Sequence, residues 1–129
     1  MEPNWLTPGV VKGLHLHAIA VAGGSTGICD EGLLQSAIER PRNLYVYGDN
    51  PSIHDLAANY CIGIIRNHPF IDGNKRTGIL ATAVFLELND YVFRPDEAEA
   101  ARIVPALAAS DMDESVFAGW VADFSMRKT

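Results

Sequence analysis

The chain has 129 residues, which is enough for one compact domain with a hydrophobic core and too few for two of ordinary size. Apolar residues make up 48% of it and charged residues 20%, a balance typical of a soluble globular protein and unlike that of a disordered one. The net charge of −6 argues against a broad nucleic-acid-binding face. We therefore expect a single domain over residues 1–129 without direct nucleic-acid contact.

No segment of the sequence is typical of a signal peptide or a membrane span. The N-terminus lacks a basic stretch followed by an apolar one. The longest apolar run, Ile79 to Leu88, contains two polar residues and is far shorter than the ~20 residues that cross a bilayer. Cys29 and Cys61 are the only cysteines, and they stand in no metal-binding spacing. These features predict a cytoplasmic protein without membrane contact.

Residues that begin and end helices predict two helices in the first third of the chain. Thr7 followed by Pro8 is a favourable N-cap and first-turn pair, and the Gly-Gly pair at 23–24 would end the helix that follows. Asp30 can cap a second helix, which we expect to end before Pro41.

Two strongly apolar helices are predicted in the middle of the chain. Ser52 and Asp55 form the pattern of a capping box, and the apolar residues that follow keep helical spacing up to Asn67. A run that is apolar nearly all round predicts a buried central helix from about Asn74 to Asn89, with a buried strand as the alternative.

The remaining segments complete an all-α bundle. Acidic residues in the stretch RPDEAEAARIV suit the first turn of a fifth helix, and an apolar face after Asp113 predicts a sixth. Residues 43–50 alternate in the manner of a short hairpin. The expected fold is therefore a helical bundle around a buried central helix, with one small β-hairpin.

The segment HPFIDGNKRTG at 68–78 concentrates groups that bind phosphate, metal or protons. It leads into the N-terminus of the fourth helix, where unpaired N–H groups and the helix dipole attract anions. Gly73 has no Cβ and lets a ligand approach the backbone. Lys75 and Arg76 add two cations where the dipole disfavours them, which predicts that an anion such as a polyphosphate offsets them.

Four of these side chains suggest a metal-assisted phosphate transfer. Asp72 is an oxygen ligand of the kind that Mg²⁺ takes, although alone it could equally be the N-cap of the next helix. His68 is a candidate general base, although a lone histidine at a helix end more often bonds to a carbonyl group. Asn74 can donate to a phosphate oxygen, and Arg76 can hold two oxygens at once.

The same segment resembles the signature loop of the Fic superfamily, whose pattern is His-x-Phe-x-(Asp/Glu)-Gly-Asn-Gly-Arg-x-x-Arg. The positions that fit are His68, Phe70, Asp72, Gly73, Asn74 and Arg76. Lys75 replaces a glycine of the pattern and Ile79 replaces its second arginine, and these departures resemble the death-on-curing (Doc) branch. The stretch GSTGICDEGLLQSAIERPRN at 24–43 is also similar to the N-terminal segment of that family.

The resemblance implies a Fic-type bundle that uses ATP and Mg²⁺ to modify a hydroxyl group of a target protein. It implies that His68 deprotonates this hydroxyl and that Asp72 holds Mg²⁺. The phosphate-binding set would be Gly73, Asn74, Lys75, Arg76 and Arg66. For Arg66, an ordinary cation at a helix C-terminus is the other interpretation.

The resemblance also implies a flap at residues 43–50, which would dock the target as an added strand. The flap residues that would make this contact are Leu44, Tyr45, Val46 and Tyr47.

Lys75 and Ile79 bear on which part of ATP is transferred. A lysine in place of glycine, and an uncharged residue in place of the second arginine, weaken the usual anchoring of the triphosphate. A nucleotide bound in the reverse direction would present its γ-phosphorus to the hydroxyl, which favours a protein kinase of the Doc type. AMP transfer is the alternative activity. A non-catalytic Fic-like interaction module is the alternative from another class, and the intact site residues argue against it.

The implied biological role is that of the toxin in a toxin–antitoxin module. The implied target is elongation factor Tu, whose modification would arrest translation. Ser110 and Glu114 match the inhibitory motif (Ser/Thr)-x-x-x-Glu-(Gly/Asn) only in part, because a serine follows the glutamate. Restraint is therefore expected from a separate Phd-like antitoxin.

His15 and His17 form a pair that could be mistaken for a metal site. Residues i and i+2 lie on different faces of a helix, so the two side chains are not expected to share a ligand. We interpret both as structural, and for His15 the alternative is a position at the periphery of the groove that would bind the target.

Overall fold

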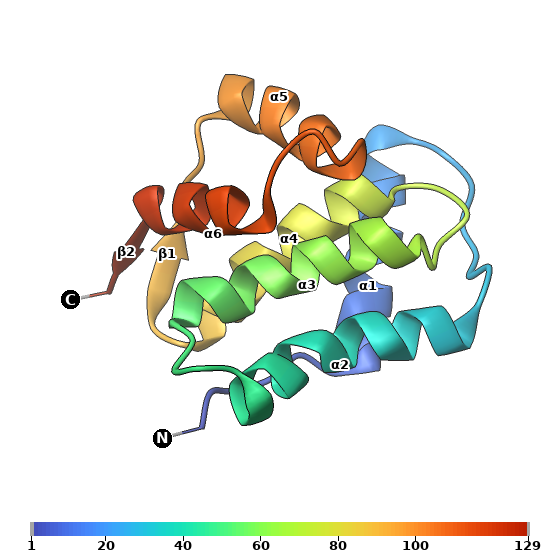
Figure 1. Ribbon diagram of the computed structural model, residues 1–129. Helices are drawn as coiled ribbons and strands as arrows, with labels where there is room; N and C mark the ends of the chain where they lie inside the picture. Colours follow the sequence, from blue (N-terminus) through green and yellow to red (C-terminus); the bar gives the residue numbers. More distant parts are fainter. Residues whose placement is uncertain (1, 129) are drawn as a thin grey trace.

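The computed structural model describes residues 2–128, and over this range the chain forms six α-helices and one two-stranded sheet (Figure 1). The helices are α1 (Pro8–Ala22), α2 (Glu31–Tyr47), α3 (Ile53–Asn67), α4 (Asn74–Leu88), α5 (Glu97–Ala108) and α6 (Glu114–Asp123). The strands β1 (Tyr91–Phe93) and β2 (Ser125–Arg127) pair in antiparallel fashion. None of these helices is long and apolar enough to cross a bilayer. The predicted helical bundle is confirmed.

Three helices begin at the caps that the sequence predicts. The side chains of Thr7 and Asp30 accept hydrogen bonds from the first turns of α1 and α2. Ser52 and Asp55 form the predicted capping box at the start of α3. Five of the six described helices have a side-chain cap, and α4 has none.

Helix α2 continues through Pro41 to Tyr47. The predicted helix end before Pro41 and the predicted hairpin at 43–50 are therefore both wrong. Pro41 has no N–H to bond the carbonyl group of Ala37, which would ordinarily weaken the helix. The ring of Pro41 is nevertheless buried, and α3 approaches so closely that a Cβ on Gly63 would lie 3.0 Å from the Ala37 oxygen. This packing keeps α2 continuous. The hairpin predicted at 43–50 is not formed, and the sheet of the fold lies at β1 and β2.

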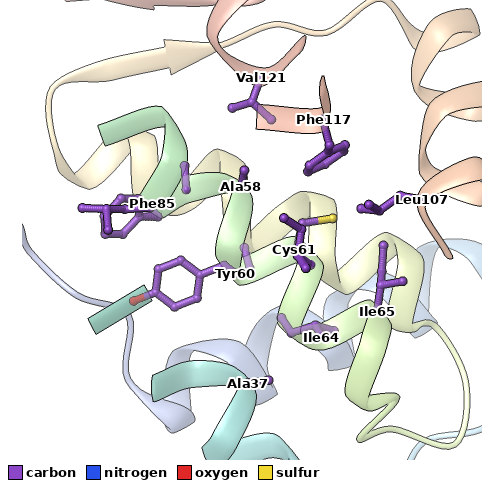
Figure 2. Packing of buried hydrophobic residues seen from close by; sticks show 14 of the residues in the cluster. Ala37, Ala58, Tyr60, Cys61, Ile64, Ile65, Phe85, Leu107, Phe117 and Val121 are labelled. Atoms are coloured by element: carbon purple, nitrogen blue, oxygen red, sulfur yellow. The ribbon is translucent and has the colours of Figure 1, made fainter. Parts of the chain in front are cut away.

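The central helix of the bundle is α3, not α4 as the sequence suggested. Nine of the fifteen residues of α3 are buried, against seven of fifteen in α4. Helix α3 packs against α2, α4, α5 and α6, and Figure 2 shows its side chains Tyr60, Cys61, Ile64 and Ile65 among residues of these neighbours. Burial raises the pKa of the Cys61 thiol, so this residue is an un-ionised part of the core. Helix α4 also packs against α1 and α5.

Candidate active site

A cleft of about 880 Å³ is lined by the end of α3, the loop that follows it, the first turns of α4, and α5. We call residues 68–73 the site loop. The lining includes the predicted residues His68, Asp72, Gly73, Asn74, Lys75 and Arg76, together with Ile79. Its wall from α5 is mostly small and apolar, with Ala100, Ala101, Val104 and Ala108. The structure therefore brings the predicted residues of the signature segment together at one cavity.

The N-terminus of α4 is left open at this cleft. Its N-cap is Gly73, with φ of 78°, and no side chain caps the first turn. The backbone N–H groups of Gly73, Asn74 and Lys75 make no hydrogen bond to any residue that the structure describes. The side chains of Lys75 and Arg76 are exposed and take part in no ion pair within residues 2–128. Unpaired N–H groups beside two cations have the chemistry that an anion-binding position requires.

The side chain of Asn74 supports the loop instead of facing a ligand. Its Oδ1 accepts a hydrogen bond of 3.0 Å from the N–H of Phe70, and its Nδ2 donates one of 2.8 Å to the Phe70 carbonyl oxygen. The side chain is buried with these partners. Both polar atoms of this side chain are therefore engaged, which disagrees with its predicted contact with phosphate. Only the backbone N–H of Asn74 is left for a ligand.

Asp72 is exposed and is not the N-cap of α4, because Gly73 occupies that position. Its Oδ2 accepts a hydrogen bond of 2.9 Å from the N–H of Ser25, and its Oδ1 accepts none from the described residues. No cluster of three or more metal-ligating side chains occurs in residues 2–128. One free carboxylate oxygen beside an anion site nevertheless fits Mg²⁺, which often takes one or two protein carboxylates and completes its shell with water and phosphate.

Residues 24–29, which we call the support segment, run antiparallel to the site loop beside it (Figure 1). The N–H of Cys29 donates to the Pro69 oxygen at 2.7 Å, and the N–H of Ile71 donates to the Gly27 oxygen at 3.1 Å. Ile28 lies opposite Phe70 in this bridge, so the N–H and C=O of Ile28 are directed away from the site loop. No periodic pattern in the sequence predicts this extended segment, and its glycines, Gly24 and Gly27, are the signal that could have indicated it.

His68 ends α3 in the left-handed conformation, with φ of 50° and ψ of 55°. Its backbone N–H donates to the Ile64 oxygen at 3.0 Å. The exposed imidazole makes no hydrogen bond to the described residues and is free to contact a ligand in the cleft. This backbone conformation costs a non-glycine residue about 1 kcal/mol or more, and such strain is concentrated at functional sites.

His15 of α1 lies against the site loop and is only 2% exposed. Its ring stacks on Phe70, with 3.9 Å between ring centroids and an interplanar angle of 5°. Its Nε2 lies 2.9 Å from the Asp72 carbonyl oxygen, and since a carbonyl can only accept, Nε2 carries the hydrogen. The structural role predicted for His15 agrees with this burial. No sequence signal joined it to Asp72, because 57 positions separate the two residues.

Arg66 does not contribute to the cleft lining. Its Nη1 donates to Ser110 Oγ at 2.6 Å, and its Nε lies 3.6 Å from Glu114 Oε2. The side chain of Arg66 therefore connects α3 with Ser110, between α5 and α6, and with the first residue of α6. This geometry agrees with the interpretation as an ordinary helix-end cation and not with the predicted phosphate contact.

The four residues predicted to dock a target strand, Leu44 to Tyr47, lie in the last turns of α2. Leu44 packs against the core, and the ring of Tyr45 meets Trp5 edge-on at 5.6 Å. Val46 and Tyr47 are 65% and 85% exposed. The N–H groups of these residues are bonded within the helix, and helical backbone presents no strand edge, so the prediction that this segment adds a strand is wrong.

Residues 5–86 match the sequence profile of the Fic/DOC family, a range that includes the support segment and the site loop. The chain is 36% identical over 109 residues to a protein named Toxin Doc from Mycolicibacterium smegmatis, an alignment that covers 80% of this chain and 82% of the relative. It is 29% identical over 111 residues to a protein named Protein kinase doc from Escherichia phage P1, with 85% and 86% covered.

Proposed function

The chain belongs to the Fic/DOC family, and on this premise we propose that it transfers the γ-phosphoryl group of Mg-ATP to a hydroxyl group of a target protein. The observation that carries the proposal is the uncapped N-terminus of α4, which meets Lys75, Arg76, Asp72 and His68 at one cleft. Positioning and charge neutralisation are most of what phosphoryl transfer requires.

Each residue has a defined part in the proposed reaction. The N–H groups of the first turn of α4 bind phosphate oxygens, and Lys75 and Arg76 neutralise their charge. Asp72, whose Oδ1 has no partner among the described residues, would hold Mg²⁺, and the ion would supply further neutralisation. His68 takes the proton of the target hydroxyl while the oxygen of that hydroxyl forms a bond to the γ-phosphorus. The bond from that phosphorus to the bridging oxygen breaks, and ADP leaves.

Phosphate transfer is favoured over AMP transfer by two residues of the cleft. Lys75 stands where an open glycine would expose more backbone, and Ile79 lines the cleft without a charge. The name of the phage relative, Protein kinase doc, supports the same choice. The test uses purified protein, its target, and ATP labelled either in the γ-phosphate or in the adenine. Label from the γ-phosphate alone is expected on the target, and label from the adenine alone would establish AMP transfer.

Mg-ATP binding separates an enzyme from a non-catalytic interaction module. Isothermal calorimetry on the full chain is expected to show binding of ATP that strengthens with Mg²⁺. A chain that binds no nucleotide in either condition would be an interaction module that has kept the fold of the family.

The names of the two relatives support a biological role as the toxin of a toxin–antitoxin pair. We expect the protein to act in the cytoplasm, to modify a translation factor such as elongation factor Tu, and to be restrained by a Phd-like antitoxin. Expression without the antitoxin should stop growth, and His68→Ala should abolish the effect. His17→Ala, in an exposed histidine of α1, is the control that should remain toxic. Mass spectrometry of translation factors treated with the protein and ATP would identify the target.

The free edge of the support segment supports a docking position for the target. The N–H and C=O of Ile28 have no partner among the described residues and can pair with an extended peptide. Ile28→Pro removes this outward N–H, and it should raise the KM for the target while ATP binding stays unchanged. An unchanged KM would exclude pairing at this edge.

A further inference from the structure

The carbonyl group of Asp72 accepts a hydrogen bond from a buried side chain of α1. His15 Nε2–H donates to this oxygen at 2.9 Å, and the imidazole is fixed in its plane by stacking on Phe70. Phe70 is itself held by the paired hydrogen bonds with Asn74. His15 thus contacts the site loop in two ways, by stacking and by a directed hydrogen bond. A residue that only filled space in the core would need no hydrogen bond.

This hydrogen bond determines the direction of the peptide group between Asp72 and Gly73. In a trans peptide the C=O and the N–H point in opposite directions, and no cis bond occurs in the described chain. Because the Asp72 carbonyl points to His15 on α1, the Gly73 N–H points away from α1. The cleft lining includes Gly73 and no residue of α1, so this direction leaves the N–H available to a ligand of the cleft.

The peptide group would not be held in this direction by the loop alone. Gly73 has φ of 78°, and glycine populates several backbone regions at similar energy, so the preceding peptide group can rotate. The opposite orientation would direct a carbonyl oxygen, with its negative partial charge, towards bound phosphate. It would also withdraw one of the N–H groups from the N-terminus of α4.

We propose that His15 is a positioning residue, which holds the Asp72–Gly73 peptide group so that Gly73 donates its N–H to a phosphate of the bound nucleotide. This inference rests on the proposed function, because it concerns the same phosphate site. His15 itself touches no ligand and acts through the peptide group.

Two substitutions separate the hydrogen bond from the stacking. His15→Phe keeps an aromatic ring against Phe70 and removes the donor, whereas His15→Gln keeps a donor near the position of Nε2 and removes the ring. His17→Phe, two residues away and exposed, is the matched control. Calorimetry with inorganic tripolyphosphate gives the affinity of the anion site without any chemical step. Thermal unfolding of each variant shows whether it is folded.

His15→Phe should weaken tripolyphosphate binding by about tenfold or more, as expected when a charged ligand loses one hydrogen bond. His15→Gln should recover most of this affinity, and His17→Phe should bind like wild type. If His15→Phe folds and binds as tightly as wild type, or if His15→Gln is as impaired as His15→Phe, the inference is wrong.

NMR of the unmodified protein tests the inference even where a variant does not fold. The ¹⁵N–¹H signal of Gly73 should shift when tripolyphosphate is added, together with those of Asn74 and Lys75. Shifts of Asn74 and Lys75 without Gly73 would overturn the role of His15 and leave the phosphate site intact. No shift at any of these amides would instead contradict the proposed function.

Discussion

Asn74 and Phe70 hold each other through two hydrogen bonds, so that one buried side chain satisfies both main-chain groups of the other residue. We predict that Asn74→Ala lowers the free energy of unfolding by about 2–5 kcal/mol, because two buried main-chain groups lose their partners. Urea denaturation measures this change. Asn67→Ala is the control, since it removes a single exposed hydrogen bond to the Leu33 oxygen and should cost less. Equal losses in the two variants would show that Asn74 does not support the loop.

The backbone conformation of His68 should lower the free energy of unfolding at a position where the proposed reaction requires a histidine. It occupies the left-handed position at the end of α3, where glycine is the favoured residue. We predict that His68→Gly is more stable than wild type by about 1 kcal/mol and transfers no phosphate. His68→Ala should be equally inactive without this gain in stability. Denaturation curves and the labelled-ATP assay measure the two effects, and an active His68→Gly would remove His68 from the reaction.

The sequence was most informative where local chemistry decides the structure. Thr7, Asp30 and the box of Ser52 and Asp55 predicted helix starts correctly, because an N-cap depends only on neighbouring residues. Pro41 misled for the opposite reason. The close approach of Gly63 that keeps α2 continuous is a tertiary contact, and no local rule contains it.

The same distinction holds at the site. The signature segment gathers at one cleft, as its composition predicted. The sequence predicts a ligand contact for the side chain of Asn74, because it does not show that the main-chain N–H and C=O of Phe70 are satisfied by this side chain. The contacts of Arg66 with Ser110 and of His15 with Asp72 cross 44 and 57 positions, and neither pair has a sequence signature.

The support segment should control Mg²⁺ affinity through Asp72. A Cβ on Gly24 would lie 3.3 Å from Asp72 Cβ and 3.2 Å from Ile19 Cδ1, whereas a Cβ on Gly23 would meet nothing within 4 Å. Both glycines have positive φ, so substitution by alanine should strain the backbone at either position. We predict that only Gly24→Ala raises the Mg²⁺ concentration needed for half-maximal activity. A Mg²⁺ titration of both variants measures this, and similar shifts in both would exclude a specific effect on Asp72.

Acid should destabilise the fold through His54. Its Nε2 is buried without a hydrogen-bond partner in the described structure, and its ring meets Tyr91 edge-on at 5.2 Å. Burial lowers the pKa of His54 from its ordinary value of 6.5, and the charge of Asp55 opposes this only in part. As the pH falls below that value, the unfolded chain binds a proton here that the folded chain does not, so stability is lost.

We predict that the free energy of unfolding falls less in His54→Phe than in wild type between about pH 7.5 and about pH 5.5. Phenylalanine keeps the edge-on contact with Tyr91 and cannot be protonated. Urea denaturation of both proteins at each pH measures the difference, because the two proteins differ only at residue 54. Parallel curves would show that His54 is not responsible.

The choice between phosphate and AMP transfer should depend on Lys75 and Ile79. Both residues line the cleft, so their substitution acts directly on the bound nucleotide. We predict that Lys75→Gly combined with Ile79→Arg produces AMP transfer and reduces phosphate transfer, because the glycine opens the backbone and the arginine anchors the far end of the triphosphate. Lys75→Gly with Ile79→Gln opens the backbone without adding the charge and should lose phosphate transfer without gaining AMP transfer. Target protein incubated with ATP labelled in the γ-phosphate or the adenine distinguishes the products. If the arginine variant still attaches only the γ-phosphate, these two residues do not set the direction in which the nucleotide binds.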